Sequence, residues 1–349
     1  MKDGKENRGR AAKKIATIIV MGGMVLIFLF DITVNLLCNH YERRWLVRAE
    51  DFRSIGAGAS RLHFLNVDNA DCILLESAGH FALIDSGWGS DNPIASARRP
   101  GYEARVLAYL KQVAADRAGR VTLDFILPTH YHYDHAGGFP AILSDPAVTV
   151  KEVFLKPLGD QNQFRYELDD WGIGENRQRI ADIAAARGFP VVETLPDKPF
   201  ALGDMTLQLL NLDSHDDPRL KGENDNSVVT LVRVFGRTAL LTGDITAPHG
   251  LEKKIARETA PLLPGGRLDL LKLPHHGYSL STSVAFLRRL RPKMGIVTNG
   301  LGQIYPNVKW NVALAARMPV YSTARENGVI VTILPTGNLS LSGNLHLGN

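Results

Sequence analysis

A buried strand that runs directly into a histidine-rich loop is the feature that most constrains this chain. The segment FILPTHYHYDHAGGF places four side chains that can bind metal within six positions, at His130, His132, Asp134 and His135. Residues two apart in a loop that leaves a strand can point the same way, so His130 and His132 can share one metal while Asp134 and His135 face another. Imidazole and carboxylate without thiolate favour zinc, with manganese or iron as alternatives. A metal-free surface loop is the competing interpretation, and the density of the pattern disfavours it.

Short apolar runs and helical patterns alternate along the rest of the chain. Three runs broken by Asn, Asp and Gly turns come first and predict antiparallel strands, after which strands alternate with helices. We expect strands at 61–67, 72–77, 80–87, 121–130, 150–156, 206–212, 227–236, 238–244, 269–277 and 294–300, a closing pair at 319–324 and 328–335, and helices at 104–115, 175–188 and 283–290. This order predicts an α/β (α+β) sandwich in one domain.

The net charge of the chain is concentrated at its amino terminus. Residues 1–14 hold six of the 40 basic and two of the 36 acidic residues, so the rest of the chain carries 34 of each. The formal charge of +4 therefore belongs to this tail and gives no support to a basic nucleic-acid-binding surface on the domain. Cys38 and Cys72 form no Cys-x-x-Cys pair and are too few for a disulfide framework, so we expect two buried thiols.

An apolar run of 23 residues, 15–37, carries Asp31 as its only charge. As a helix rising about 1.5 Å per residue, it can cross the roughly 30 Å hydrocarbon core of a membrane. A cleaved signal peptide is the alternative, but the run exceeds the usual apolar length of roughly 7 to 15 residues. Six basic residues precede the run and four follow it, which favours a cytoplasmic amino terminus and an extracytoplasmic domain. We therefore expect a basic cytoplasmic tail at 1–14, a single-pass transmembrane anchor at 15–37, a juxtamembrane linker at 38–59 and one domain at 60–349.

The motif at 130–135 resembles the signature of the metallo-β-lactamase superfamily, and the likeness extends over most of residues 60–340. ALIDSG, which contains Asp85, is similar to the superfamily's first motif, in which the carboxylate supports the metal loop. LLTGD is similar to the motif whose aspartate bridges two metals, here Asp244, and LKLPHHG to the last histidine motif, at His275 and His276. The resemblance implies a four-layer αββα metallo-β-lactamase sandwich with two zinc ions.

Motifs in the second half of the chain resemble the hydrolase domain of the ComEC competence branch of this superfamily. They are NDNSVV paired with LLTGD, then LPHHG with a serine-containing loop, and VYSTARENGVIVTI near the end. This branch implies phosphodiester substrates, chiefly DNA. The chain has no clear equivalent of the third histidine that many superfamily members give to the first metal, and His215, Asp225 and Asn226 are the candidates in that interval. It also has Tyr305-Pro306 where branch members often have His-Pro.

The resemblance implies a hydrolytic water held between two metals, with its pKa lowered towards neutrality. One of the two adjacent histidines would bind metal while the other contacts the substrate. We assign His276 to the metal and His275 to the substrate, with the reverse order left open. The predicted catalytic residues are Asp134, His275 and Asp244, and the predicted metal ligands are His130, His132, Asp134, His135, Asp244 and His276.

The leading functional hypothesis is a membrane-anchored zinc phosphodiesterase that acts on nucleic acid or on a cell-envelope polymer, with the membrane as its expected partner. Hydrolysis of a lactone, thioester or β-lactam at the same metal centre is a second hypothesis. The neutral formal charge of the domain leaves it open, because strong polyanion binding needs clustered Lys and Arg. A third hypothesis is a non-catalytic binding module that keeps metal for its stability, and retention of the ligands together with the bridging aspartate disfavours it.

Overall fold

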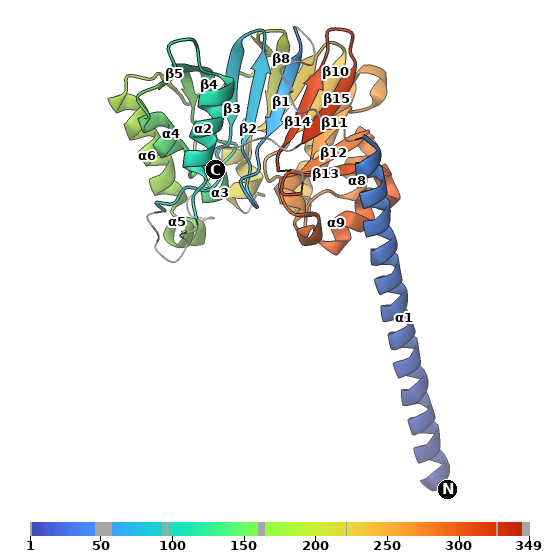
Figure 1. The fold of residues 1–349 in the computed structure, drawn as a ribbon. Helices are drawn as coiled ribbons and strands as arrows, with labels where there is room; N and C mark the ends of the chain where they lie inside the picture. The colour runs from blue at the N-terminus through green and yellow to red at the C-terminus, as the bar shows by residue number, and fades with distance from the viewer. Residues whose placement is uncertain are drawn as a thin grey trace.

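Two stacked β-sheets form the centre of the domain (Figure 1). The computed structural model describes residues 2–45, 58–92, 94, 98, 100–159, 165–220, 222–325 and 327–343. Within them, eight strands form the first sheet, in the order β15-β14-β1-β2-β3-β4-β5-β6, and seven form the second, in the order β13-β12-β11-β10-β9-β8-β7.

The strands and helices are short apart from the first helix. The first sheet contains β1 (Ser60–Phe64), β2 (Ile73–Ser77), β3 (His80–Ile84), β4 (Val121–Leu127), β5 (Val148–Phe154), β6 (Val191–Val192), β14 (Val329–Ile333) and β15 (Leu339–Gly343). The second contains β7 (Phe200–Leu202), β8 (Met205–Leu210), β9 (Val229–Val234), β10 (Arg237–Leu241), β11 (Leu270–Lys272), β12 (Met294–Val297) and β13 (Val320–Ser322). The helices are α1 (Lys2–Trp45), α2 (Glu103–Val113), α3 (Tyr133–Ala136), α4 (Phe139–Ser144), α5 (Arg165–Trp171), α6 (Ile173–Ala186), α7 (Leu251–Thr259), α8 (Val284–Leu290) and α9 (Pro306–Asn311), which a π-helical turn, η10 (Val312–Ala316), follows.

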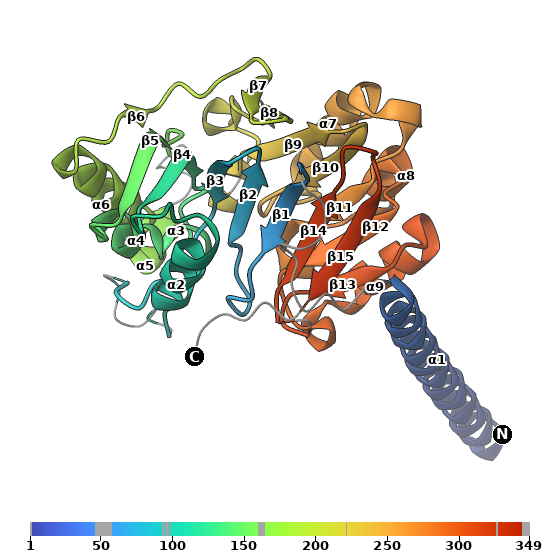
Figure 2. The ribbon, with the colours of Figure 1, turned by 45° about the horizontal axis from the view of Figure 1, so that its top comes forward.

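Three apolar cores hold the layers together. The central core lies between the sheets and joins side chains such as Phe64 and Leu207. An outer core packs α2, α4 and α6 against the first sheet, and another packs α7, α8 and α9 against the second. Figure 2 shows these helix layers on the two outer faces. The four-layer αββα sandwich is therefore confirmed.

The carboxyl ends of strands from both sheets meet at one edge of the sandwich. Strands β3 and β4 pair in parallel in the first sheet, and β10 and β11 pair in parallel in the second. Parallel neighbours end at the same edge of each sheet, and the contact of His135 with Asp244 brings the loops of the two sheets together. Those loops carry Asp85, the motif at 130–135, Asp244 and the pair His275-His276.

Both strands of the predicted closing pair form, but they lie in different sheets. Segment 319–324 forms β13, which pairs in parallel with β12 in the second sheet, whereas 328–335 forms β14, which pairs with β1 and β15 in the first sheet. The turn between them crosses from one sheet to the other. The opening three strands are antiparallel, as the sequence predicts.

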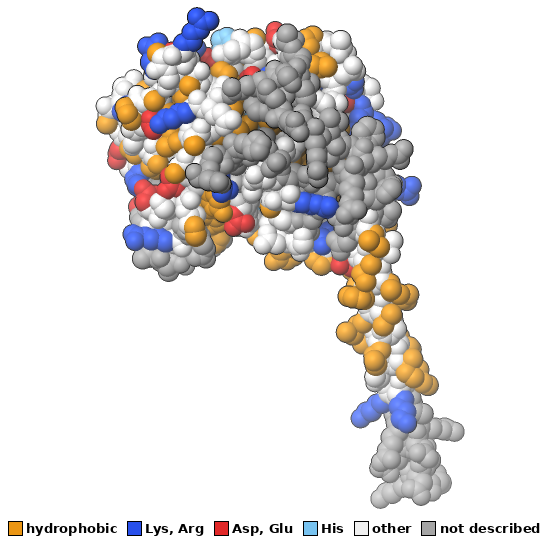
Figure 3. All heavy atoms as spheres, in the orientation of Figure 1, with side chains coloured by type: hydrophobic (Ala, Val, Ile, Leu, Met, Phe, Trp, Pro, Cys, Tyr) orange, Lys and Arg blue, Asp and Glu red, His pale blue; other side chains and the backbone are white. Residues whose placement is uncertain are grey.

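The first helix continues well beyond the expected anchor. It runs without interruption from Lys2 to Trp45, so residues 38–45, expected in the linker, are helical, and residues 46–57 lie outside the described part of the chain. The segment Lys13–Val34 is long and apolar enough to cross a membrane, and Figure 3 shows apolar side chains along it. Of the two predicted buried thiols, Cys72 is buried, and the side chain of Cys38 lies outside the described residues.

Candidate metal centre

Four side chains from both sheets converge on one point in a geometry that suits a metal ion. Nε2 of His276 lies 3.3 Å from Oδ2 of Asp134 and 3.1 Å from Oδ2 of Asp244. Nε2 of His135 lies 3.2 Å from the same Asp244 oxygen, 3.1 Å from Nε2 of His276 and 3.9 Å from Oδ2 of Asp134. Ligands about 2.0 Å from a tetrahedral zinc are about 3.3 Å apart. The separations therefore fit one ion held by Asp134, His135, Asp244 and His276, which we call the main cluster.

The hydrogen bonds behind the two imidazoles strengthen this interpretation. Nδ1 of His135 lies 2.9 Å from Oδ2 of Asp85, and Nδ1 of His276 lies 3.0 Å from Oγ1 of Thr298, whose hydroxyl donates to Asp71. Each Nδ1–H thus donates backwards, so the Nε2 atom of each ring faces the two carboxylates and can take a proton or bind a metal. Positive charge is needed between these groups. This donor set fits a divalent metal.

A second pair of imidazole nitrogens faces inward beside this cluster. Nε2 of His130 lies 3.2 Å from Nδ1 of His132, again the separation of two ligands on one ion. The ring centroids of His130 and His135 are 4.1 Å apart, so the two positions are adjacent. Nδ1 of His130, the ring nitrogen that points away from His132, lies 3.2 Å from Oγ of Ser227. The rear nitrogen of His132 lies 3.6 Å from Oε1 of buried Glu167. The structure thus brings all six predicted ligands into one two-part site.

None of the three candidates for a third ligand of the first metal contacts His130 or His132 through a described interaction. The carboxylate of Asp225 accepts hydrogen bonds from Thr246. The Asn226 amide donates to the carbonyl of residue 157 and accepts from Ser214. His215 lies 3.4 Å from exposed Asp216. Any further ligand to this ion therefore comes from solvent, from substrate or from another residue.

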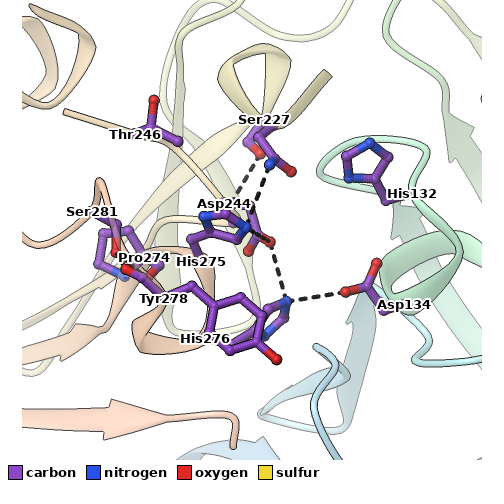
Figure 4. Close-up of polar contacts among 12 residues, drawn as sticks. His132, Asp134, Ser227, Asp244, Thr246, Pro274, His275, His276, Tyr278 and Ser281 are labelled. Carbon is purple, nitrogen blue, oxygen red and sulfur yellow. Dashed lines mark hydrogen bonds and ion pairs between the residues drawn. The ribbon is translucent and has the colours of Figure 1, made fainter. Parts of the chain in front are cut away.

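The two adjacent histidines turn away from each other, as Figure 4 shows. His276 is buried and lies between Asp134 and Asp244, whereas the side chain of His275 is 24% exposed, with Nε2 4.0 Å from Oδ2 of Asp244. Both residues have a left-handed backbone, with φ of 52° and 50°, and this turn separates the two rings. The arrangement suits His276 as a ligand and His275 as a substrate contact, which remains a prediction.

Close backbone packing fixes the histidine loop. A Cβ atom at Gly137 would lie 2.6 Å from the backbone nitrogen of Gly89, and one at Gly138 would lie 2.6 Å from the carbonyl oxygen of Ser86. Any larger residue at Gly137 or Gly138 would push the loop away from the segment after β3. That segment carries Asp85, whose carboxylate also accepts from the Thr129 amide at 2.7 Å. Glycine is therefore needed here for contact between segments.

Two residues that the sequence did not point to complete the buried part of the site. Lys272 is fully buried, and its Nζ lies 2.5 Å from Oδ2 of Asp71 and 3.4 Å from Oδ1 of Asp244. A carboxylate oxygen of Asp71 also lies within 4.8 Å of ligand atoms of His135, Asp244 and His276, but Asp71 faces Nδ1 of His276 at 3.3 Å. It therefore orients a ligand from behind. The position of Lys272, a single lysine inside an apolar strand, could have indicated a buried ion pair. Asp71 lies in a polar turn that matches no motif, so its sequence carried no such indication.

The electrostatic surroundings favour positive charge at the main cluster. Burial lowers the pKa of His135, but the carboxylates of Asp244, Asp85 and Asp134 outweigh burial and raise this pKa to about 10. Burial raises the pKa of Asp244, but His135, His276 and Lys272 outweigh it and hold that pKa well below its usual value. Without a metal the cluster holds protons, and a divalent cation would replace them.

Comparisons with known proteins agree with this site. Residues 65–153 match the family model described as "Metallo-beta-lactamase superfamily". The chain is 25% identical over 302 residues to ComE operon protein 3 of Bacillus subtilis, an alignment that covers 80% of this chain and 35% of that protein. It is 30% identical over 116 residues to Recombination protein 2 of Haemophilus influenzae, covering 32% of this chain and 13% of that protein. The chain thus spans about a third or less of these relatives.

Solved structures with a similar arrangement share little sequence with this chain. The metallo-β-lactamase fold protein YhfI from Bacillus subtilis has a TM-score of 0.46 at 11% identity and covers 81% of this chain and 100% of its own. CmlA, a diiron β-hydroxylase from Streptomyces venezuelae, has a TM-score of 0.38 at 16% identity, and the match covers 73% of this chain and 47% of the CmlA chain. The family model over residues 65–153, the similarity to the two competence-related proteins and the αββα sandwich together support a metallo-β-lactamase fold and a metal-dependent hydrolase.

Proposed function

We propose that this chain is a membrane-anchored phosphodiesterase with a binuclear zinc centre. One observation carries the binuclear proposal, namely two adjacent groups of inward-facing ligand atoms, His130 with His132 and His135 with His276. When bound, two zinc ions would supply a water of lowered pKa and positive charge beside the reacting group. The sequence similarity to competence proteins supports a phosphodiester as the substrate class.

The residues of the chain would perform the remaining tasks. Oδ2 of Asp244 lies beside Nε2 of His135 and Nε2 of His276, and with these two histidines it would hold a metal ion. Burial lowers the pKa of His275 to about 4, so at neutral pH this side chain is an uncharged donor. Nδ2 of Asn224 lies 3.5 Å from Nε2 of His275. These two groups could donate to the oxygens of a phosphate as negative charge develops.

One panel of assays tests the hydrolytic proposal. The full-length chain in detergent is analysed for bound metal and assayed with bis-p-nitrophenyl phosphate, single-stranded DNA, a lactone and a β-lactam. We expect about two zinc ions for each chain and phosphodiester hydrolysis that His132→Ala and Asp134→Ala abolish. Activity on the lactone or β-lactam alone would contradict the phosphodiesterase, and bound metal with no turnover would favour the binding module.

The membrane placement is a separate part of the proposal. The apolar span Lys13–Val34 supports a single anchor, and the basic residues before it favour a cytoplasmic amino terminus with the domain outside. Alkaline carbonate should leave the chain in the membrane fraction. A reporter fused after residue 349 should be active outside the cytoplasm, and activity confined to the cytoplasm would overturn this topology.

A further inference from the structure

The end of the membrane-spanning segment packs against the domain. Strand β13 and helix α9 contact α1, the rings of Phe30 and Trp310 meet edge to face with centroids 5.6 Å apart, and Val34 is buried. Phe30 and Val34 lie in the last turns of the apolar span, which a membrane interface would surround. Nε1 of Trp310 has no hydrogen-bond partner in the structure, and tryptophan is enriched at such interfaces. If α1 spans a bilayer, α9 lies at its surface.

The metal site lies at this same end of the domain. Figure 1 shows α3, α5 and α9 at the end from which α1 projects, while the far ends of the strands point the other way. Helix α3 contains Asp134 and His135, and α5 contains Glu167 beside His132. The turn of the β2–β3 hairpin and that of the β7–β8 hairpin lie at the opposite end, where Oγ of Ser77 accepts from the Asp204 amide. The site therefore faces the membrane side.

Exposed apolar side chains surround the entrance to this site. Outside α1, the large apolar side chains that are exposed among the described residues are Trp171, Val191, Leu280, Tyr305 and Leu314. Three of these five, which we call the rim, flank the site, namely Trp171 (45% exposed), Leu280 (63%) and Tyr305 (45%). A fourth, Leu314, lies on η10, which packs against α8 and α9. Four of these five exposed apolar side chains thus lie at the membrane-facing end of the domain.

Ring contacts connect two members of the rim, Trp171 and Tyr305, to residues of the metal site. The ring of Trp171 lies 4.6 Å from the ring of His132. The ring of Tyr305 lies 5.4 Å from that of Tyr278, which lies 5.5 Å from the ring of His275. Leu280 follows His276 in a loop held by the hydrogen bond from the Ala247 amide to the Leu280 carbonyl at 2.7 Å. An apolar group held at the rim would leave its polar end within reach of the metals.

Lys272, the lysine paired with the site carboxylates, is not placed to bind a nucleic acid. Strong binding of DNA needs Lys and Arg that face the phosphates. The lysine that contacts the site carboxylates, Lys272, is fully buried and paired with Asp71, so it is not offered to a substrate. Apolar exposure around a polar reaction centre instead matches a molecule with an apolar body and a charged head.

We propose that the rim rests in the lipid surface of the membrane that α1 spans, and that the substrate is an amphiphile whose phosphodiester lies in the headgroup layer. This inference rests on the anchoring and phosphodiester hydrolysis proposed above. Hydrolysis adds the hydroxyl group of water to phosphorus, breaks one phosphorus–oxygen bond and leaves the proton of that water on the departing alcohol. The apolar tail of the substrate stays in the bilayer throughout.

Site-specific labelling measures the depth of the rim. In the full chain with Cys38→Ser, where Cys72 is buried, a polarity-sensitive dye is attached at Leu280→Cys or at the control Asp204→Cys. The protein is placed in phosphatidylglycerol and phosphatidylethanolamine vesicles that contain brominated acyl chains. We expect strong quenching at position 280 and none at position 204. Retention in alkaline carbonate without quenching at 280 would overturn the rim proposal alone, whereas extraction by carbonate would overturn the anchor.

A substrate pair tests the chemical class. A phosphodiester with two acyl chains in vesicles is compared with the same headgroup without chains and with single-stranded DNA. We expect kcat/KM about tenfold or more higher for the acylated ester, and Leu280→Asp to lower its hydrolysis about tenfold, the loss expected from one apolar contact. Val191→Asp, an equally apolar exposed position on β6, should have no effect. A preference for DNA, or equal rates with and without chains, would overturn the amphiphile proposal, and no turnover of any phosphodiester would overturn the proposed function.

Discussion

Nζ of Lys272 lies 2.5 Å from Oδ2 of Asp71 in a fully buried ion pair directly behind the metal cluster. The same ammonium group lies 3.4 Å from Oδ1 of Asp244 and donates to the Gly243 carbonyl at 2.9 Å. One lysine thus compensates two buried carboxylates, and burial lowers its pKa less than Asp71 and Asp244 together raise it.

Removal of this lysine should be strongly destabilising. Lys272→Met leaves Asp71 and Asp244 buried without their cation, which we expect to lower the free energy of unfolding by about 3–5 kcal/mol. Chemical denaturation measures the loss. Adding Asp71→Asn removes one of the uncompensated charges, so the double variant should recover part of it. A double variant less stable than Lys272→Met would contradict this account.

Metal stoichiometry should separate the ligands from nearby histidines. His132→Ala should remove about one zinc ion for each chain, because its Nδ1 faces His130 Nε2 across the first position. His215→Ala is the matched control, since His215 lies beside exposed Asp216 and makes no described contact with the site. Elemental analysis of both purified variants gives the result. Equal loss of zinc in both would assign His215 to the site.

A substitution behind His135 should weaken metal binding without disturbing the fold. Asp85 has a left-handed backbone with φ of 57°, a conformation that Asn tolerates well. Asp85→Asn therefore replaces the carboxylate that accepts from His135 and Thr129 with little backbone cost. We expect a loss of metal affinity of about 10-fold to 100-fold, measured by competition with a chelator. Unchanged affinity would show that the carboxylate does not orient the ligand.

The stability of the metal-free protein should fall as the pH rises. The pKa of His135 is raised to about 10 in the folded protein, above the 6.5 of an unfolded chain. The stabilisation that protonated His135 contributes to the folded protein is therefore complete below pH 6.5 and is lost as the pH rises towards 10. Urea denaturation of chelated protein at pH 6.5 and 9.5 should show the decline, and zinc-loaded protein should not. A chelated protein equally stable at both pH values would contradict the prediction.

Loss of His275, the partly exposed histidine, should affect turnover rather than metal content. His275→Asn keeps a residue that tolerates the left-handed backbone at φ of 52° and removes the imidazole that faces the entrance. We expect kcat to fall on the order of 10²-fold with zinc content unchanged. Single-turnover kinetics and elemental analysis on the same sample provide both readouts. Loss of zinc would instead make His275 a ligand.

The strands that carry the site could be predicted because each is a short apolar run followed by a turn or by a polar loop. The histidine loop after β4 could be predicted from this local pattern of an apolar run and a polar loop. The four αββα layers were predicted from the resemblance of whole motifs to the superfamily. Helix α9 and strand β15 were missed because their sequences, PNVKWN and LSLSG, are short and carry no clear periodic apolar pattern.

Parts of the site depend on contacts that no local pattern records. Asp71 lies in a polar turn before β2 and reaches His276 only because β11 and the first sheet pack together. Glu167 reaches His132 from α5, a helix that the sequence did not predict. Such residues acquire their roles from tertiary packing, so one sequence alone cannot distinguish them from ordinary buried acids.

The main cluster draws Asp134 and His135 from the first sheet and Asp244 and His276 from the second, and His135 and His276 are 141 positions apart in the chain. An ion bound there would be a cross-link between the two halves of the sandwich, closing a long loop as a disulfide does. The domain has one buried free thiol among its described residues and no such covalent link. Metal supply would therefore set how tightly the two halves are joined as well as whether the site can act.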